Sequence, residues 1–146
     1  MWYYKNKQVK TIEDIPKDVF GFIYEVYHIP TGKKYIGKKQ LMSNRTLPPL
    51  KGQKRKRKVV KESDWKTYYG SQKEIKELVK ESKQEEFRRE ILQFCFTKKQ
   101  LTYYELKWQF AKGVLESDEY LNDNLMGKFF KRDLDNQILA DHTEKS

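Results

Sequence analysis

A turn sequence between two strand-like runs is the feature that most constrains the fold of this chain. Residues 20–29 are rich in β-branched and aromatic side chains, which favour a strand. Residues 30–33 are Pro-Thr-Gly-Lys, where the proline presets φ and the glycine accepts a positive φ. Residues 34–37 favour a returning strand. The sequence therefore predicts a β-hairpin, with Tyr24 and Tyr35 opposite each other near its open end.

The remaining predicted elements are two helices and one strand. Residues 72–83 predict a helix, because Ser71 and Glu74 form a capping signature ahead of apolar residues on one helical face. Residues 86–96 are dense in large apolar side chains and predict a third, buried strand. Residues 98–113 predict a second helix, whose core-facing stripe comprises Leu101, Tyr104, Trp108, Ala111 and Leu115.

We therefore expect a small α+β domain, in which a three-stranded antiparallel sheet is flanked by helices. The length of 146 residues suits a single domain. Residues 2–4 are a candidate edge strand, and residues 38–50 are a candidate helix that Pro48 and Pro49 interrupt. Residues 128–146 form a polar tail that we expect to fray.

Composition excludes several classes of protein. Aromatic residues make up 14% of the chain, which is too many for a disordered protein. Cys95 is the only cysteine, so the chain forms no internal disulfide and no cysteine-rich zinc site. The sequence has no apolar run of membrane-spanning length and no signal peptide. We expect a soluble, cytoplasmic protein that does not bind membranes.

The positive charge is concentrated in one segment. Residues 51–61 contain seven basic residues and no acidic one, and without these seven the net charge falls from +10 to +3. Self-repelling charges resist packing, so we expect a basic loop that lies along a phosphate backbone, the alternative being a loop that only aids solubility. The candidate DNA-binding residues are Lys38, Lys39, Lys51, Lys54, Arg55, Lys56, Arg57, Lys58 and Lys61.

Two short motifs lie within the predicted hairpin. Phe22-Ile23-Tyr24 is on the first strand, and Tyr35-Ile36-Gly37 follows after ten residues. The pair resembles the GIY and YIG strands of the GIY-YIG nuclease superfamily, which includes phage and intron homing endonucleases. Phe22 replaces the first glycine of that pattern, and Gly21 lies one residue earlier. The resemblance covers about residues 20–127, and the basic segment at about 46–63 is an insertion.

The resemblance also implies a set of site residues. The superfamily's arginine after the YIG strand, expected on a helix, corresponds to Arg45. Its metal-binding glutamate corresponds to Glu105, on the helix that follows the third strand. Its asparagine corresponds to Asn124, with Asn122 as a nearby alternative. Tyr69 takes the place of the His or Tyr that many members carry after the arginine.

These residue types suit phosphodiester hydrolysis. Glu105 suffices as a protein ligand for Mg²⁺ (or Mn²⁺), because such an ion takes its other ligands from water and the phosphate. Arg45 can hold a phosphate through its planar fork of donors. The resemblance makes Tyr24 the general base, with its pKa of ~10 lowered by nearby cations, while Tyr35 and Tyr69 orient the water or phosphate.

Each of these residues also has an ordinary structural interpretation, such as a sheet aromatic, a surface glutamate or a turn asparagine. Their joint order and spacing favour a divalent-metal-dependent DNA endonuclease of phage or homing type, acting on double-stranded DNA as a monomer or a homodimer. The alternatives are a catalytically inactive, basic DNA-binding module of the same fold, and an RNA-binding protein that uses its aromatics for stacking.

Overall fold

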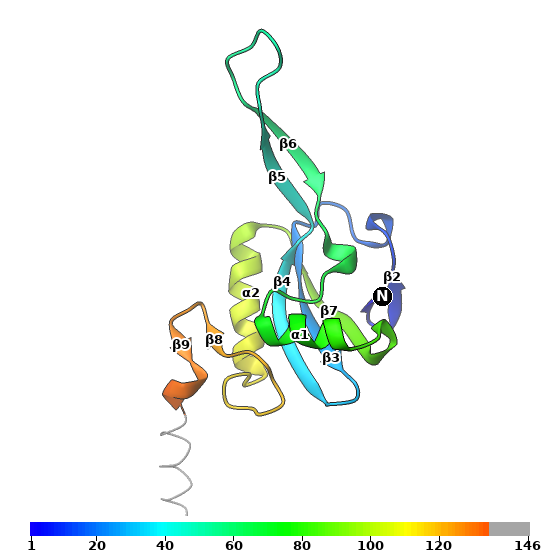
Figure 1. Cartoon of the computed structure of the whole chain (residues 1–146), viewed down its shortest axis with the longest axis vertical. Helices are drawn as coiled ribbons and strands as arrows, with labels where there is room; N and C mark the ends of the chain where they lie inside the picture. Colours follow the sequence, from blue (N-terminus) through cyan, green and yellow to red (C-terminus); the bar gives the residue numbers. More distant parts are fainter. Residues whose placement is uncertain (135–146) are drawn as a thin grey trace, which may run out of the picture.

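The computed structural model describes residues 1–134, apart from the side chains of Asn44, Arg45 and Lys58. Its centre is a five-stranded sheet in the order β2-β1-β7-β3-β4, and not the three-stranded sheet that we predicted (Figure 1). The additional strands are β1 (Trp2–Tyr4) and β2 (Lys7–Val9). β1 pairs in parallel with β7, so the sheet is mixed and β1 is an internal strand.

The predicted hairpin is confirmed and is longer than expected. β3 (Gly21–His28) pairs antiparallel with β4 (Lys33–Gln40) over its full length. β7 (Phe87–Cys95) pairs antiparallel with the other side of β3, with a bulge between Ile23 and Tyr24. β4 therefore lies at one edge of the sheet and β3 at its centre.

The two faces of the sheet have separate cores. Phe22, Tyr24 and Val26 point to one face, which is covered by α1 (Lys73–Glu81) and by a 3₁₀ turn at Trp65–Thr67 (Figure 1). The opposite face carries a core built around the alternate residues of β3 and β4, Ile23 and Ile36, and is covered by α2 (Lys98–Ala111). This strict alternation follows from the period of two along a strand.

Both predicted helices are present, with shifted ends. α1 is capped by Gln72, whose side chain accepts a hydrogen bond from the N–H of Ile75, and not by Ser71. α2 (Lys98–Ala111) is capped by Thr97 as expected, and it ends two residues before the predicted end. Ala111 is exposed, whereas Gln109, outside the predicted apolar stripe, is buried.

Gly37 provides space for two tyrosine rings. A methyl group at this position would lie 2.6 Å from the hydroxyl oxygen of Tyr24 and 2.9 Å from the ring of Tyr35. The Tyr24 ring leans across the neighbouring strand, because its residue is paired with Gly37 in the sheet. The glycine of the second motif is therefore required for close packing on this face.

The edge of β4 is only partly covered. The N–H of Lys34 donates to Glu119 O (2.8 Å), and the N–H of Leu121 donates to Lys34 O (2.7 Å). Asn122 continues this coverage with its side chain, which accepts from the N–H of Ile36 (3.1 Å) and donates to Ile36 O (2.8 Å). The amide of Asn122 thus takes the place of a neighbouring strand.

The basic segment is part of a hairpin, and neither a loop nor a helix as predicted. β5 (Met42–Leu47) pairs antiparallel with β6 (Arg57–Glu62), and together they form a separate two-stranded sheet, here called the ribbon. The ribbon projects away from the body of the domain (Figure 1). Pairing of backbone groups outweighs the charge repulsion that argued for a loop. Only residues 48–56, at its tip, connect the strands without pairing.

The segment after α2 returns along the domain. β8 (Asn124–Leu125) and β9 (Phe129–Phe130) form a small hairpin, so the predicted tail begins with an ordered strand. Lys131 Nζ donates to the carbonyls of Ser117 and Tyr120. The expected fraying beyond residue 134 lies outside the described residues. Within residues 1–134, the helices are too short or too polar to cross a membrane.

We predict that Asn122→Ala lowers the free energy of unfolding by about 2 kcal/mol, because it leaves buried groups of Ile36 without full partners. Asn122 is only 3% exposed. Asn124→Ala is the matched control, since Asn124 is more exposed and bonds only within its own turn, to Asp123 and Gly127. Urea titrations of both variants check this, and equal losses would contradict it.

Candidate active site

A pocket of about 360 Å³ lies at the β4 edge, where the covering segment ends. Three regions that are distant in sequence line it: β4, the start of α1 with the residue before its cap, and α2 with the loop that follows. Its lining residues are polar with few exceptions. They are Tyr35, Ser71, Gln72, Glu105, Gln109, Asn122, Asp123, Asn124, Met126 and Gly127.

Glu105 reaches this pocket from α2. Its side chain is 19% exposed, and one carboxylate oxygen lies 4.0 Å from Lys38 Nζ. Burial raises the pKa of the Glu105 carboxyl, while the ammonium and the backbone of Lys38 act in the opposite direction. Glu105 therefore lies on the helix that follows the third predicted strand, as expected. Its partner is Lys38, and not the helix neighbours Gln109 or Lys112 that a surface glutamate would use.

Tyr24 and Tyr35 lie on the same face of the hairpin, with ring centroids 6.3 Å apart. They are diagonal neighbours in the middle of the hairpin, because Tyr24 is paired with Gly37 and Tyr35 with Val26. The predicted position near the open end is wrong. Tyr35 lines the pocket, whereas Tyr24 is 1% exposed and lies behind it.

The pKa of Tyr24 moves in the opposite direction to the one predicted, and the pKa of Tyr35 is raised as well. Burial raises the pKa of Tyr24 well above 10. Burial, followed by the negative charge of Glu105, raises the pKa of Tyr35 to about 12. No arginine lines the pocket. Both side chains are therefore neutral phenols at physiological pH, whose hydroxyl groups can donate hydrogen bonds.

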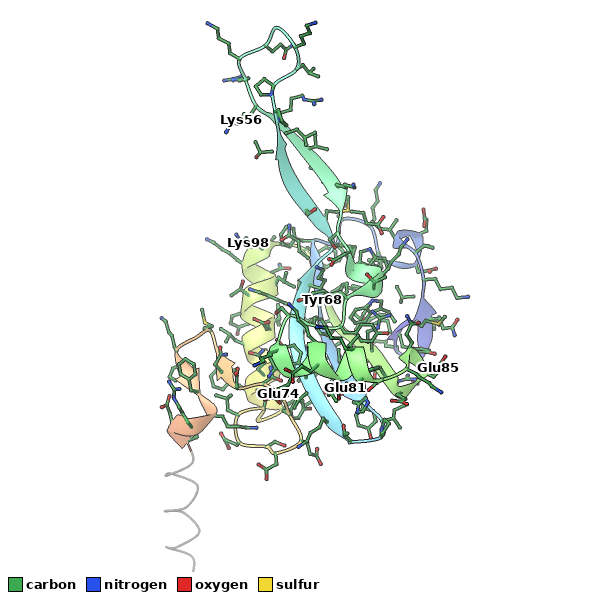
Figure 2. The ribbon with its side chains drawn as sticks, in the orientation of Figure 1. Lys56, Tyr68, Glu74, Glu81, Glu85 and Lys98 are labelled. Carbon is green, nitrogen blue, oxygen red and sulfur yellow. The ribbon has the colours of Figure 1, made fainter. Side chains whose placement is uncertain are left out.

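Tyr68 and Tyr69 both pack against the core on this face of the sheet, and Tyr68 is labelled in Figure 2. The ring centroid of Tyr68 lies 6.0 Å from that of Tyr24. Tyr69 lies further along the same face, where it packs on Phe87 and on the guanidinium of Arg89, 4.2 Å from its ring centroid. Neither Tyr68 nor Tyr69 lines the pocket that contains Glu105 and Tyr35.

The predicted cationic residues are in three different environments. Lys38 lies beside Glu105 and also donates to Thr102 Oγ1 (3.2 Å). Lys39 Nζ lies 2.6 Å from Asp64 and 4.0 Å from the centre of the Tyr68 ring, so its charge is already paired. Arg45 lies in β5, where its backbone pairs with Val59. It is therefore on the ribbon and not on the helix that the resemblance implied.

Of the two candidate asparagines, Asn122 is the one that ties the loop to the sheet. Its two bonds to Ile36 leave its amide fully engaged. Asn124 lies in a turn, where its carbonyl oxygen accepts from Gly127 N. Both line the pocket, and Asp123 between them adds a second carboxylate to it.

The residues of this pocket suit a hard divalent cation that keeps most of its own ligands. Glu105 and Asp123 are oxygen ligands of the type Mg²⁺ prefers. In the described part of the chain, no three His, Cys, Asp or Glu side chains gather into a complete metal site. Glu105 is desolvated, with one cation at 4.0 Å, so a bound metal ion would relieve the cost of its charge.

Sequence reasoning missed several pocket residues. Gln109 donates to Ile36 O (3.1 Å), yet a glutamine in a helix gives no signal of burial. Asp123 had a detectable signal, since it lies between the two candidate asparagines.

A known family model matches most of the chain. Residues 2–125 match the family model described as "Putative endonuclease segE, GIY-YIG domain". No curated protein and no solved structure matches the chain significantly. The match covers most of the chain and includes both hairpin motifs, Glu105 and the two asparagines. The chain therefore belongs to the GIY-YIG nuclease superfamily.

Proposed function

We propose that this protein is a divalent-metal-dependent endonuclease that hydrolyses phosphodiester bonds in double-stranded DNA, of the phage or homing type. The observation that carries the proposal is the meeting of Glu105 and Tyr35 in one pocket, at the end of the covered edge of β4. The match to a nuclease family supports it. An open sheet edge beside a carboxylate leaves room for an extended phosphate backbone.

In this proposal Glu105 holds Mg²⁺ (or Mn²⁺), and Asp123 is a second candidate ligand. The ion supplies charge neutralisation at the phosphate and lowers the pKa of bound water when DNA is present. Lys38, 4.0 Å from Glu105, adds a positive charge beside the same site. Arg45 remains a candidate phosphate ligand, carried by the ribbon.

Tyr35 is the tyrosine that we propose to contact substrate. A phenol with a pKa of about 12 donates a hydrogen bond at neutral pH, so it can orient the attacking water or a phosphate oxygen. Tyr24 is a positioning residue behind it, since its hydroxyl is buried against Gly37 and Tyr35. This order of importance reverses the sequence-based expectation, which placed Tyr24 first.

We expect Glu105→Gln to lower cleavage of plasmid DNA on the order of 1000-fold or more, because it removes the charged metal ligand. DNA affinity measured in EDTA should stay within about twofold, since one carboxylate contributes no phosphate contact. Plasmid nicking assays with and without Mg²⁺ measure the first quantity. A wild-type protein that binds DNA and never cuts it would instead support the inactive DNA-binding module.

We expect Tyr35→Phe to lower kcat on the order of 100-fold, since it removes the donor that faces the pocket. Tyr24→Phe removes a buried hydroxyl and should have a smaller effect on kcat. Single-turnover cleavage by both variants at saturating DNA separates these roles. A larger loss of kcat for Tyr24→Phe than for Tyr35→Phe would instead support Tyr24 as the general base.

The raised pKa of Glu105 predicts a pH dependence of stability in EDTA. Above the ordinary value of 4.5 and up to its raised pKa, the folded protein retains a proton that the unfolded chain releases. The free energy of unfolding therefore falls as the pH rises through the raised pKa. Glu105→Gln lacks this loss, so its stability relative to wild type should be higher at about pH 7 than at about pH 4. Urea titrations at both pH values measure the free energy of unfolding of the variant and of the wild type. A difference between the two proteins that is the same at both pH values would contradict the prediction.

A further inference from the structure

The side chains that the structure describes on the ribbon form no core on either of its faces. Val59 and Val60 are adjacent in β6 and so point to opposite faces, yet they are 37% and 64% exposed. Leu50 at the tip is also exposed. Two-stranded ribbons without a packed face are marginally stable alone. The valines on both faces of this ribbon are therefore exposed rather than packed against its own domain.

The base of the ribbon, in contrast, is held firmly. Leu41 is buried, and its N–H donates to Phe20 O (2.9 Å) while its carbonyl accepts from Ser63 N (2.9 Å). The hydroxyl of Ser63 donates to Gln40 O (2.6 Å). Trp65, two residues further, is fully buried in the core. The core therefore sets the direction in which the ribbon leaves the domain, although the described side chains of the paired strands beyond the base do not pack against the domain.

The ribbon carries only one sign of charge. Residues 42–61 contain eight basic residues and no acidic one. The acidic residue that follows, Glu62, accepts from Trp65 Nε1 and lies near Lys66, so it belongs to the base. Among the described residues, Lys51, Lys54, Arg55, Lys56, Arg57 and Lys61 form no ion pair. Figure 2 shows Lys56 in the distal half of the ribbon, well away from the body of the domain.

We propose that the ribbon enters the major groove of duplex DNA, with its tip cations on the flanking phosphates; this inference rests on the proposed nuclease function. Strands in a sheet lie about 4.8 Å apart, so two strands with their side chains fill a groove of about 12 Å and do not fit one of about 6 Å. The exposed valines supply apolar surface of the kind that contacts thymine methyl groups.

The ribbon places this contact at a distance from the cleaved bond. From Lys38 beside the pocket to Leu47 at the end of β5 the chain advances nine residues, an extended reach on the order of 30 Å. One turn of B-DNA is about 34 Å long. The major-groove contact therefore lies within about one helical turn of the phosphate in the pocket, on one side of it.

Binding is tested with the full chain carrying Glu105→Gln, in EDTA, on a duplex of about 40 base pairs. The tip variant changes Lys51, Lys54, Arg55 and Lys56 to Gln. Its matched control changes four exposed lysines far from the ribbon, Lys5, Lys7, Lys10 and Lys83, to Gln. We expect the tip variant to lose at least about tenfold in affinity at 0.1 M salt and its salt slope to flatten by roughly 2–4 units. The control should lose less than about twofold.

Methylation interference then identifies the groove, because dimethyl sulfate marks guanine N7 in the major groove and adenine N3 in the minor groove. We expect interference at guanines on one side of the cleavage position and its loss in the tip variant. Interference at adenines only, or equal losses for the tip variant and its control, would overturn the inference. Tighter binding of single-stranded DNA or RNA than of the duplex would overturn it as well.

The two proposals fail in different ways. If the wild-type protein nicks DNA in Mg²⁺ and the tip variant binds DNA as tightly as the wild type, the nuclease function is supported and the ribbon inference is wrong. If the wild-type protein never cuts DNA but shows methylation interference that the tip variant loses, the ribbon inference is supported and the nuclease function is wrong. Circular dichroism of the tip variant checks its fold, which we expect to be intact because none of the four residues is buried.

Discussion

The unpaired edge of β4 is the constraint on which the candidate site depends. A strand at the edge of a sheet must have its backbone groups satisfied by something other than a further strand. Here Asn122 and Gln109 both bond to Ile36, which docks the loop after α2 against the sheet. That docking brings Asp123 and Glu105 into the same pocket as Tyr35. The site therefore forms because the backbone groups of one edge residue, Ile36, are hydrogen-bonded by side chains from α2 and from the loop that follows it.

The same packing makes the pocket costly for a lone negative charge. Burial raises the pKa of Glu105 and of both tyrosines. A buried carboxyl group that is costly to ionise is characteristic of functional sites, where a ligand of opposite charge offsets the cost of its negative charge. A divalent cation brought together with DNA would do so here. The tyrosines, in turn, are suited to donate hydrogen bonds rather than to accept protons.

The domain and its ribbon are stabilised in different ways. The domain has a core on each face of its sheet, whereas the ribbon depends on the bonds at its base (Figure 1). Like charges along the ribbon repel one another, and an anionic partner would remove that cost. The part of the protein that holds the pocket is therefore rigid, while the part that we propose to enter the groove is open to adjustment by the DNA.

The sequence by itself determined the hairpin, the two helices and the position of Glu105, because these follow from local propensity and from the period of each element. It also predicted the family, since the two strand motifs and the helix glutamate occur in the order that is typical of the GIY-YIG superfamily. Only the tertiary structure decided that Asn122 bonds to the edge of β4 and that Tyr68 packs against Tyr24, because the sequence does not show which of two nearby residues of one type makes such a contact. It likewise decided that the basic segment pairs as two strands. Register and chain direction arise from contacts distant in sequence, which local patterns do not contain.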